Sequence, residues 1–563
     1  MDSLASARAL TSSRVFYNLV LPVSCAWVAY RVLRYTLTKK QIDLVIGPKR
    51  KSWFADTGDM NELLDPNAWP AWEALRKQYG PVTKVNGFVG TQFLHIYDPL
   101  ALYHILVKDQ DFYHENELFR TTFALAFGPG LLSSLGDQHR KQRKLLTPAF
   151  SVAHIRELIP VFYSVTYKLR HALVSQVEHG KTEIDLLSWI TRTALEIIGQ
   201  SGLGYSFDPL VEGEVAHPFA AAVRDFAQVL NTFTVSRFLV LPLVHKLGPP
   251  KFRRFIVDAV PWKRLHRLRD IIDTIHNTCV GVFESKKAAI ERGEPPIAGN
   301  PWDGKDIISL LLKGNMAATE SERITDEEIA AQLSTLVFAA MDTTSNTLAR
   351  TLELLSQHKD VQERLRQEVT EARAEGGDLA YHELDTLPYL DAVCREVLRL
   401  HPVITFLLRT PTKDMTLPLH KPVTLADGSI TDHILVSKGQ DIMIGMMASN
   451  RNPELWGPDA DEFKPERWLS PLPQAVQDAP SAGVYSHLLT FIGGQRGCIG
   501  FKFAILEMKV ILSVLLESLK FELTDKKVVW EINGVVQPCV KDPSSDKTVI
   551  SFPMNVSLVP SKN

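Results

Sequence analysis

The stretch HLLTFIGGQRGCIGFKFAILEMKV, His487 to Val510, decides how this 563-residue sequence is interpreted. An apolar run leads into four glycines around Cys498, and a helical pattern follows the cysteine. A glycine-rich loop in front of a helix suits two kinds of site. One cradles the phosphates of a nucleotide, and the other presents a cysteine thiolate to a ligand.

The nucleotide interpretation is the weaker of the two. The glycines have roughly the rhythm of a dinucleotide loop, which a strand and a helix should flank. However, the helix after the loop is predicted to run to about Lys520, and the remaining chain is too short for the sheet of a dinucleotide crevice. Arg496 and Cys498 also occupy the centre of the loop, where a pyrophosphate site uses small residues. A nucleotide-dependent dehydrogenase is therefore disfavoured.

The cysteine interpretation accounts for more of the loop. Cys498 precedes a helix, and the free N–H groups and dipole of a helix start favour a thiolate. Gly497 and Gly500 have no Cβ, so a large flat ligand could approach the backbone closely. Arg496 is placed to pair with an anionic group of that ligand. The loop is predicted to present Cys498 to a bound cofactor.

Composition narrows the classes of protein. Hydrophobic residues make up 45% and charged residues 22% of the chain, as in a well-packed globular protein. The net charge of -2 gives no electrostatic basis for a nucleic-acid partner. No CxxC pair occurs, which argues against a disulfide framework and a structural zinc site. The five scattered cysteines are Cys25, Cys279, Cys394, Cys498 and Cys539.

The N-terminus predicts a membrane anchor. Val15 to Tyr30 carries no charge, and extension to Leu33 brings the run close to the roughly 20 residues that cross a bilayer. Arginines and lysines follow it, so the positive-inside rule leaves the main body on the cytosolic side. An amphipathic or core helix is the alternative.

Apolar spacing predicts a mainly α fold of the α+β class. Ile155 to Lys287 and Thr325 to Arg399 have helical periodicity, and 291–304 is expected to be a surface loop. Strand-like runs are expected at Val82–Tyr97, Val403–Thr424 and Ile442–Met447, and again after Phe521.

One predicted helix carries polar groups into the core. Thr325 and Glu328 form a T-x-x-E capping box at its start. Apolar residues on most of its sides indicate burial, yet AAMDTT, Ala339 to Thr344, lies in its middle. Burial of Asp342 without a partner would be costly, so the segment either has a function or turns to a solvated edge.

These segments resemble those of a known family. Phe491 to Gly500, FIGGQRGCIG, resembles the haem-binding loop F-x-x-G-x-R-x-C-x-G of the cytochrome P-450 monooxygenases at every defining position. AAMDTT resembles the oxygen-activation segment of the long central helix of that family. Glu396-Val397-Leu398-Arg399 resembles its E-x-x-R motif, and Phe463 to Trp468, FKPERW, its P-E-R-F segment. The resemblance begins at about Gly47 and is to the microsomal, fungal-like type.

The resemblance implies a cytochrome P-450 fold, helix-rich with small β-sheets. Residues 1–45 would be the membrane anchor and basic junction, and 46–563 the haem-thiolate monooxygenase domain. Cys498 would be the proximal ligand of the iron of haem b. The other implied cofactor contacts are Arg496, Arg143, Arg409 and His139 at the propionates, with Phe491 and Gly500 shaping the pocket.

Further roles follow from the same resemblance. Asp342 and Thr343 would be the acid–alcohol pair that supplies protons during oxygen activation. The structural network would consist of Glu396, Arg399 and Arg467. The family often has Trp at the position of His139 and Gly at that of Ala340.

The implied activity is that of a monooxygenase anchored in the endoplasmic reticulum membrane. It would oxidise a lipophilic small molecule of secondary metabolism, such as a terpenoid, steroid or fatty acid, with O2. Electrons would come from an NADPH-dependent P-450 reductase, with cytochrome b5 as a second candidate donor, and Lys141, Lys144 and Lys502 are candidate reductase contacts. A reductase-independent peroxide-using or isomerising enzyme and a non-catalytic haem-binding membrane protein are the alternatives.

Three apolar segments are expected to line the substrate pocket. They are Thr121–Phe127, Val403–Leu408 and Val535–Pro538. None of them contains a charged residue, so they predict no clamp for a carboxylate.

Overall fold

The computed structural model describes residues 41–50, 58–213, 217–293, 304–374, 377–542, 544–545 and 547–560. The predicted membrane span at 15–33 and most of the predicted loop at 291–304 lie outside these residues. Among the described helices, none is by itself long and apolar enough to span a membrane. One bent pair, Gly136–Phe150 with Val152–Glu178, passes that test of length and composition when its two parts are joined across a 57° bend.

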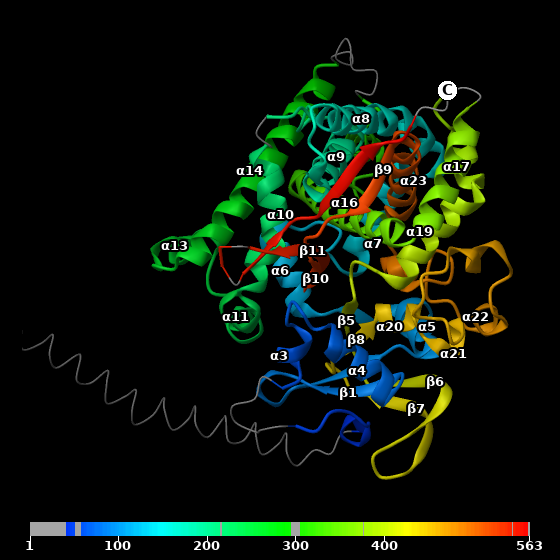
Figure 1. Ribbon diagram of the computed structural model, residues 1–563. Helices are drawn as coiled ribbons and strands as arrows, with labels where there is room; N and C mark the ends of the chain where they lie inside the picture. The colour runs from blue at the N-terminus through cyan, green and yellow to red at the C-terminus, as the bar shows by residue number, and fades with distance from the viewer. Residues whose placement is uncertain are drawn as a thin grey trace, which may run out of the picture.

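A helical body and small sheets make up the fold, as predicted (Figure 1). The longer helices are α4 (Trp69–Tyr79), α6 (Glu117–Phe127), α7 (Gly136–Leu146), α8 (Val152–Glu178), α9 (Leu186–Ile198), α10 (Pro218–Asn231), α13 (Pro250–Ala259), α14 (Lys263–Glu291), α15 (Ile307–Ala317), α16 (Asp326–Gln357), α17 (Lys359–Arg373), α19 (Pro388–Leu400) and α23 (Phe501–Ser518). The shorter ones are α3 (Met60–Leu63), α5 (Pro99–Tyr103), α11 (Thr234–Leu239), α12 (Leu241–Val244), α18 (Tyr381–Thr386), α20 (Met446–Asn450), α21 (Pro453–Trp456) and α22 (Gln474–Asp478).

In the described part of the chain, the strands form four small sheets. The five-stranded sheet has the order β1-β2-β8-β5-β3, in which only β2 and β8 pair in parallel. The others are β10-β11-β12, β4-β13-β9 and the pair β6-β7, all antiparallel. The strands are β1 (Val82–Asn86), β2 (Gln92–Ile96), β3 (Tyr113–Glu115), β4 (Glu183–Asp185), β5 (Phe406–Pro411), β6 (Met415–Thr424), β7 (Ile430–Val436), β8 (Ile442–Gly445), β9 (Leu519–Leu523), β10 (Val528–Asn533), β11 (Val535–Lys541), β12 (Thr548–Ile550) and β13 (Pro553–Leu558). The chain after α23 thus builds antiparallel sheets, not the parallel sheet that a dinucleotide crevice requires.

The central helix is α16, which passes through the middle of the helical body (Figure 1). It begins at the predicted capping box, where Thr325 and the Glu328 side chain each bind the other's backbone N–H. It then continues without a break for 32 residues. The sequence and structure agree here because a cap and an apolar surface are local signals.

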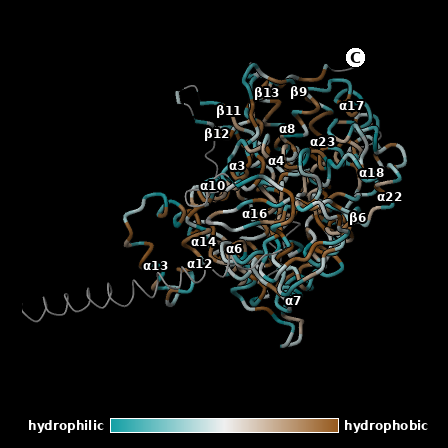
Figure 2. Tube along the Cα trace, turned by 90° about the horizontal axis from the view of Figure 1, so that it is seen from below, coloured by the Kyte–Doolittle hydropathy of each residue, from teal (hydrophilic) through white to brown (hydrophobic). Residues whose placement is uncertain are grey.

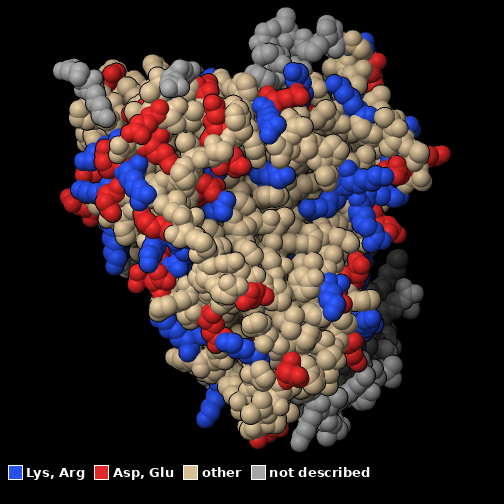
Figure 3. Space-filling view, turned by 90° about the vertical axis from the view of Figure 1, so that its right-hand side faces the viewer, with Lys and Arg blue, Asp and Glu red and all other residues tan. Residues whose placement is uncertain are grey.

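Charge is mixed over the face shown in Figure 3. Lysines and arginines alternate with acidic side chains around a wide uncharged area. This face therefore carries no field of a single sign.

Candidate functional site

Two short 3-10 turns and the start of α23 hold the cysteine loop. The turns are η9 (Leu489–Phe491) and η10 (Gly494–Arg496). The backbone N–H of Cys498 donates to the Phe491 carbonyl oxygen at 2.9 Å, and that of Gly497 donates to the Gly494 oxygen at 3.1 Å. Cys279, Cys394 and Cys539 are buried, whereas Cys498 is exposed. The loop therefore presents one accessible thiol.

The glycines of the loop serve different purposes. Gly494 has φ +69°, and a Cβ there would lie 2.0 Å from the Leu106 carbonyl oxygen. A Cβ on Gly500 would meet only Phe150, at an ordinary 3.7 Å. Packing of the protein on itself thus requires Gly494, whereas the protein leaves room beside Gly500. Only the second case agrees with clearance for a flat ligand.

The backbone is strained beside the loop. Ser486, His487 and Ile492 have φ of 52°, 58° and 39°. Positive φ is costly for residues with a Cβ, and most of all for a β-branched one. Such strain persists only where the surroundings hold it, and it gathers at functional sites.

The thiol of Cys498 is subject to opposing influences. The surrounding protein raises the pKa of Cys498 by burial, although the residue is exposed in part to solvent. The backbone N–H of Gly500 and the charge of Arg143 act the other way and favour the thiolate. The helix start thus lowers the pKa of Cys498 as predicted, but burial outweighs this effect and the pKa of the free thiol is raised. A metal ion bound to the sulfur would deprotonate it outright.

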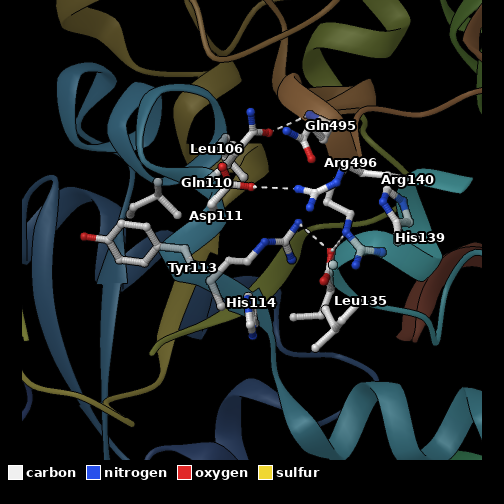
Figure 4. Close-up of a pocket in the computed structure, with 14 residues that line it drawn as sticks. Leu106, Gln110, Asp111, Tyr113, His114, Leu135, His139, Arg140, Gln495 and Arg496 are labelled. Carbon is white, nitrogen blue, oxygen red and sulfur yellow. Dashed lines mark hydrogen bonds and ion pairs between the residues drawn. The ribbon is translucent and has the colours of Figure 1, made fainter. Parts of the chain in front are cut away.

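A buried ion-pair cluster lies next to the loop. Arg496 Nε is 3.1 Å and Arg409 Nη2 is 3.5 Å from the same carboxylate oxygen of Glu115. Arg496 also donates to the Ser134 carbonyl oxygen at 2.6 Å. Figure 4 shows Arg496 and His139 on the wall of one pocket, with Leu135 below them. Burial lowers the pKa of Arg496 to about 10, against the charge of Glu115, which raises it.

Arg143 and His139 complete the cluster from α7. Arg143 is half-buried, burial lowers its pKa, and its side chain makes no hydrogen bond or ion pair within the described ranges. His139 is buried, and its pKa falls to about 3 because of burial and the charges of Arg496, Arg143 and Arg140. Its ring is thus neutral at pH 7 and retains one N–H to donate.

These residues fit a haem. Arg409 and Arg496 share the single carboxylate of Glu115, and Arg143 lies near Arg496, so among the described residues the cluster has an excess of positive charge suited to two propionates. The unpaired Arg143 lies close enough to Cys498 for their charges to interact. An accessible thiol beside cations that outnumber their acidic partners is what a dicarboxylate metal cofactor requires.

The middle of α16 has one open face. Ala339 is exposed, although Val337 and Met341 on either side are buried. Thr343, one turn later, is half-buried and donates its hydroxyl to the Ala339 carbonyl oxygen at 2.6 Å. Its lone pairs remain available to accept a hydrogen bond. Ala340, where the family often has Gly, leaves the helix unbroken.

Asp342 is a buried acid in the same turn. It is 7% exposed, and its carboxylate accepts no hydrogen bond from the part of the chain that is described. Burial raises its pKa to about 7, with a smaller opposite influence of Arg224 and a further increase from Asp225 on α10. The group can therefore take up or release a proton near neutral pH.

Leu131 connects α16 to the cysteine loop. Its N–H donates to Gln332 Oε1 at 3.1 Å, and its carbonyl accepts from Arg496 Nη1 at 3.3 Å. One residue of the α6–α7 connection thus fixes the helix that carries Thr343 relative to the loop that carries Cys498.

Aromatic rings from three helices pack beside Ala339. The Phe338 ring of α16 lies 4.8 Å from that of Phe127 and 5.6 Å from that of Phe123, both on α6. Phe226 of α10 lies 5.5 Å from Phe338. The predicted pocket segment Thr121–Phe127 is therefore next to the open face of α16.

The other two predicted pocket segments also meet. Val536 donates its N–H to the Val403 carbonyl oxygen at 2.8 Å. Phe406, however, stacks on Trp72 of α4 at 5.0 Å.

The structure brings Glu396, Arg399 and Arg467 together beneath the loop. Arg399 binds both carboxylate oxygens of Glu396 at 2.8 Å, and both side chains are fully buried. Arg467 lies 3.5 Å from Glu396 and 3.0 Å from Asp459. The indole N–H of Trp468 donates to the other Glu396 oxygen at 2.9 Å.

Asn450 transmits this network to the cysteine loop. Arg399 donates to the Asn450 carbonyl oxygen at 3.1 Å. The Asn450 side chain accepts from the Leu489 N–H at 2.8 Å and donates to Thr490 Oγ at 2.9 Å. The network thus reaches the turn that precedes Phe491.

Two acids of the site were missed by sequence reasoning. Glu115 lies on short β3, and only the tertiary fold places it between two arginines. Glu507 of α23 is buried, and burial raises its pKa well above its ordinary value, against a smaller opposite influence of Thr344 on α16. A carboxyl in an apolar helix was the available signal for Glu507.

Comparison with known proteins agrees with this geometry. The family model described as cytochrome P-450 matches residues 57–543. Cytochrome P-450 monooxygenase 91 of Postia placenta is 46% identical, with 92% of this chain and 95% of the relative aligned. The ganoderic acid synthetase of Ganoderma lucidum is 41% identical, with 94% of this chain and 96% of the relative aligned. A P-450 monooxygenase of Hericium erinaceus is 31% identical, with 95% of this chain and 96% of the relative aligned.

The chain therefore belongs to the cytochrome P-450 family and is an enzyme of its monooxygenase class. Membership implies a haem-thiolate cofactor.

Proposed function

We propose that this protein oxidises a lipophilic small molecule with O2 and with electrons that a reductase takes from NADPH. The observation that carries the proposal is the exposed thiol of Cys498 beside the arginine cluster. In this proposal Cys498 is the iron ligand, and Phe491 and Gly500 shape its surroundings. The propionate contacts are Arg143, His139, Arg409 and Arg496.

A bound haem would supply dioxygen activation, favoured by electron donation from the thiolate. The chain's own residues do the remaining work. Gly500 and Arg143 stabilise negative charge on the sulfur. Neutral His139 adds an N–H to the cation cluster. The buried groups Glu396, Arg399 and Arg467 are structural and hold the loop in position.

Asp342 and Thr343 are the proposed proton-supplying residues. The Thr343 hydroxyl sits at the open face, donates to the Ala339 carbonyl oxygen and keeps lone pairs that can accept a hydrogen bond. Asp342, with a pKa of about 7, holds or releases a proton one residue away. A proton can thus be available at Thr343 Oγ at neutral pH without a permanent buried charge.

The proposed substrate class is supported by the aromatic rings that pack beside α16. Phe123, Phe127, Phe226 and Phe338 supply apolar surface, which favours a lipophilic skeleton of terpenoid, steroid or fatty-acid type. The relative named ganoderic acid synthetase supports a role in secondary metabolism.

Location at the endoplasmic reticulum membrane is also proposed, with the body facing the cytosol. Beyond the predicted N-terminal anchor, α11 to α13 project from the body and carry hydrophobic stretches (Figure 2). Leu243 is 78% and Phe255 66% exposed. Contiguous exposed apolar residues favour contact with a membrane or a partner. We expect Leu243→Asp to reduce flotation with phospholipid vesicles, whereas Leu435→Asp, at an exposed leucine of β7, should not.

The decisive experiment is spectroscopic. The reduced, carbon-monoxide-bound protein should show the red-shifted absorbance of a thiolate-ligated haem, and Cys498→Ala should lose it. An unchanged spectrum in Cys498→Ala would refute the ligand assignment.

Turnover assays separate the alternatives. Activity that depends on NADPH and reductase supports the proposal, while equal activity with peroxide alone supports a reductase-independent enzyme. If Thr343→Ala left every activity untouched, a non-catalytic haem protein would be favoured.

A further inference from the structure

One cation near the aromatic walls lacks an acidic partner. Arg237 of α11 is mostly buried, and its Nη2 donates to Thr122 Oγ of α6 at 3.3 Å. Its Nε is buried and has no hydrogen-bond partner. Within the residues that the structure describes, Arg237 makes no ion pair. Burial alone lowers its pKa to about 10, because no nearby carboxylate offsets the loss of water.

The geometry of the guanidinium indicates what is missing. Nε and Nη2 form the edge of arginine that pairs side-on with both oxygens of a carboxylate. Thr122 Oγ already donates its proton to the Leu118 carbonyl oxygen at 2.7 Å, so it offers Arg237 only a neutral acceptor. A buried arginine with this edge unsatisfied is costly unless an anion binds to it.

Arg237 points into the protein, not towards the exposed apolar surface of α11 to α13. Its acceptor Thr122 is 4% exposed. Val235 and Leu239, on the same short helix, are among the exposed large hydrophobic residues. A ligand of Arg237 would therefore lie on the side of α11 that faces α6, which disfavours a lipid phosphate at the surface.

Helix α6 connects this cation to the open face of α16. Thr122 precedes Phe123, whose ring lies 5.6 Å from Phe338, and Phe338 precedes the exposed Ala339. The contacts thus run from Arg237 to Thr122 of α6, and from Phe123 of the same helix to Phe338 of α16. The side chains that join the two helices here are aromatic.

We propose that Arg237, supported by Thr122, binds the carboxylate of a lipophilic acid whose apolar body extends along Phe123 and Phe338 to the reaction face. This inference rests on the proposed function, since it specifies the substrate class of the same site. It also sets the orientation, because the carbon that is oxidised lies remote from the carboxylate. The apolar pocket segments gave no sign of such a clamp, and Arg237 lies outside all three.

Binding of dodecanoic acid and of its methyl ester to the haem-loaded protein tests the proposal. Equilibrium dialysis should show the acid bound at least about tenfold more tightly than the ester, as expected for a charge-assisted bidentate pair. Arg237→Leu should remove this preference and leave the ester affinity within about twofold, since the ester makes no such pair. Arg237→Lys should keep part of the preference, because lysine is a point charge without the two-pronged edge.

Arg253→Leu is the matched control. Arg253 of α13 also lacks an ion pair among the described residues, but it donates only to the Gly248 carbonyl oxygen on the outside of the protein. The Arg253→Leu variant should retain the preference for dodecanoic acid over its methyl ester. Equal affinity for acid and ester in the unaltered protein would overturn the proposal, and this comparison holds even if Arg237→Leu fails to fold.

Two further outcomes are informative. An equal loss of acid and ester binding in Arg237→Leu would mean that the arginine only supports the fold, and would overturn the subsite. If Arg237→Leu lost binding to anionic phosphatidylserine vesicles but still preferred the acid over the ester, Arg237 would be assigned to lipid phosphate instead. A thiolate-haem spectrum without acid preference refutes the subsite alone, whereas acid preference without haem refutes the proposed function alone.

Discussion

The cysteine loop and the contact of α16 with α6 are built differently. The cysteine loop is fixed by backbone hydrogen bonds, a strained turn and a fully buried ion-pair network. Helices α16 and α6 meet mainly through aromatic rings, and polar groups such as Asp342 and Arg237 make no ion pair in the described chain. Directional bonds hold one geometry, whereas ring contacts tolerate rearrangement. The protein thus fixes the side that would hold the cofactor and leaves the substrate side adaptable.

The largest effect is expected when the network below the loop is broken. Arg399→Leu leaves the buried Glu396 carboxylate without its bidentate partner, so unfolding free energy should fall by about 3–5 kcal/mol. The haem content per chain should fall with it, because Arg399 supports Asn450 and the loop. Urea unfolding and pyridine haemochrome assays measure the two.

Lys421→Ala is the control for that prediction. It breaks an ion pair with Glu454 in which both side chains are more than half exposed, so the change should be about 0–1 kcal/mol. Similar losses in the two variants would show that the buried network has no special role.

Substitution by alanine should have different effects at Gly494 and at Gly500, which lie on the two sides of Cys498. Gly494→Ala forces a Cβ against the Leu106 carbonyl oxygen at positive φ, so it should cost at least about 1–3 kcal/mol of stability. Gly500→Ala meets no obstacle in the protein and should leave the apoprotein stable, yet lower haem affinity. Thermal unfolding of apoprotein and haem titration separate these effects. If Gly500→Ala bound haem normally, the cofactor would not lie against Gly500.

In α16, the buried Asp342 predicts that the free energy of unfolding depends on pH. The folded carboxyl keeps its proton up to about pH 7, while the unfolded one releases it near its ordinary value. The folded state binds more protons in between, so unfolding free energy should fall as pH rises through this range. Asp342→Asn should remove that part of the decline, on the order of 4 kcal/mol at most. Urea unfolding at about pH 5 and about pH 8 provides the comparison; parallel declines would contradict the burial of a neutral acid.

The smallest effect is expected on the outer surface of α7. Lys144 pairs with Glu322 at 2.5 Å, and both side chains are exposed, so Lys144→Ala should change stability by about 0–1 kcal/mol. If the reductase docks here, its KM should rise because a positive charge is lost. Glu322→Ala breaks the same pair but keeps the lysine, so it should not raise that KM. Equal effects would exclude an electrostatic role of Lys144.

Local patterns in the sequence determined a large part of this protein. The cysteine loop, the capping box of α16 and the E-x-x-R spacing are short-range signals. The structure contains the cap and the Glu396–Arg399 pair, while the roles of Cys498 and Thr343 stay predictions. Apolar periodicity gave the helical fold with small sheets. Such signals succeed because hydrogen bonds of a cap, and the side-chain spacing of a helix, depend on neighbours in the chain.

Tertiary structure alone decided the electrostatics. Glu115 and Arg409 come from β3 and β5, and only their pairing places both beside Arg496. The raised pKa of Cys498 could not be read from the loop, because burial depends on every element packed around it. Arg237 belongs to the same class, since a lone arginine in a sequence does not reveal whether a carboxylate faces it. Charge pairs and desolvation act through space between distant segments, and the order of residues does not specify them.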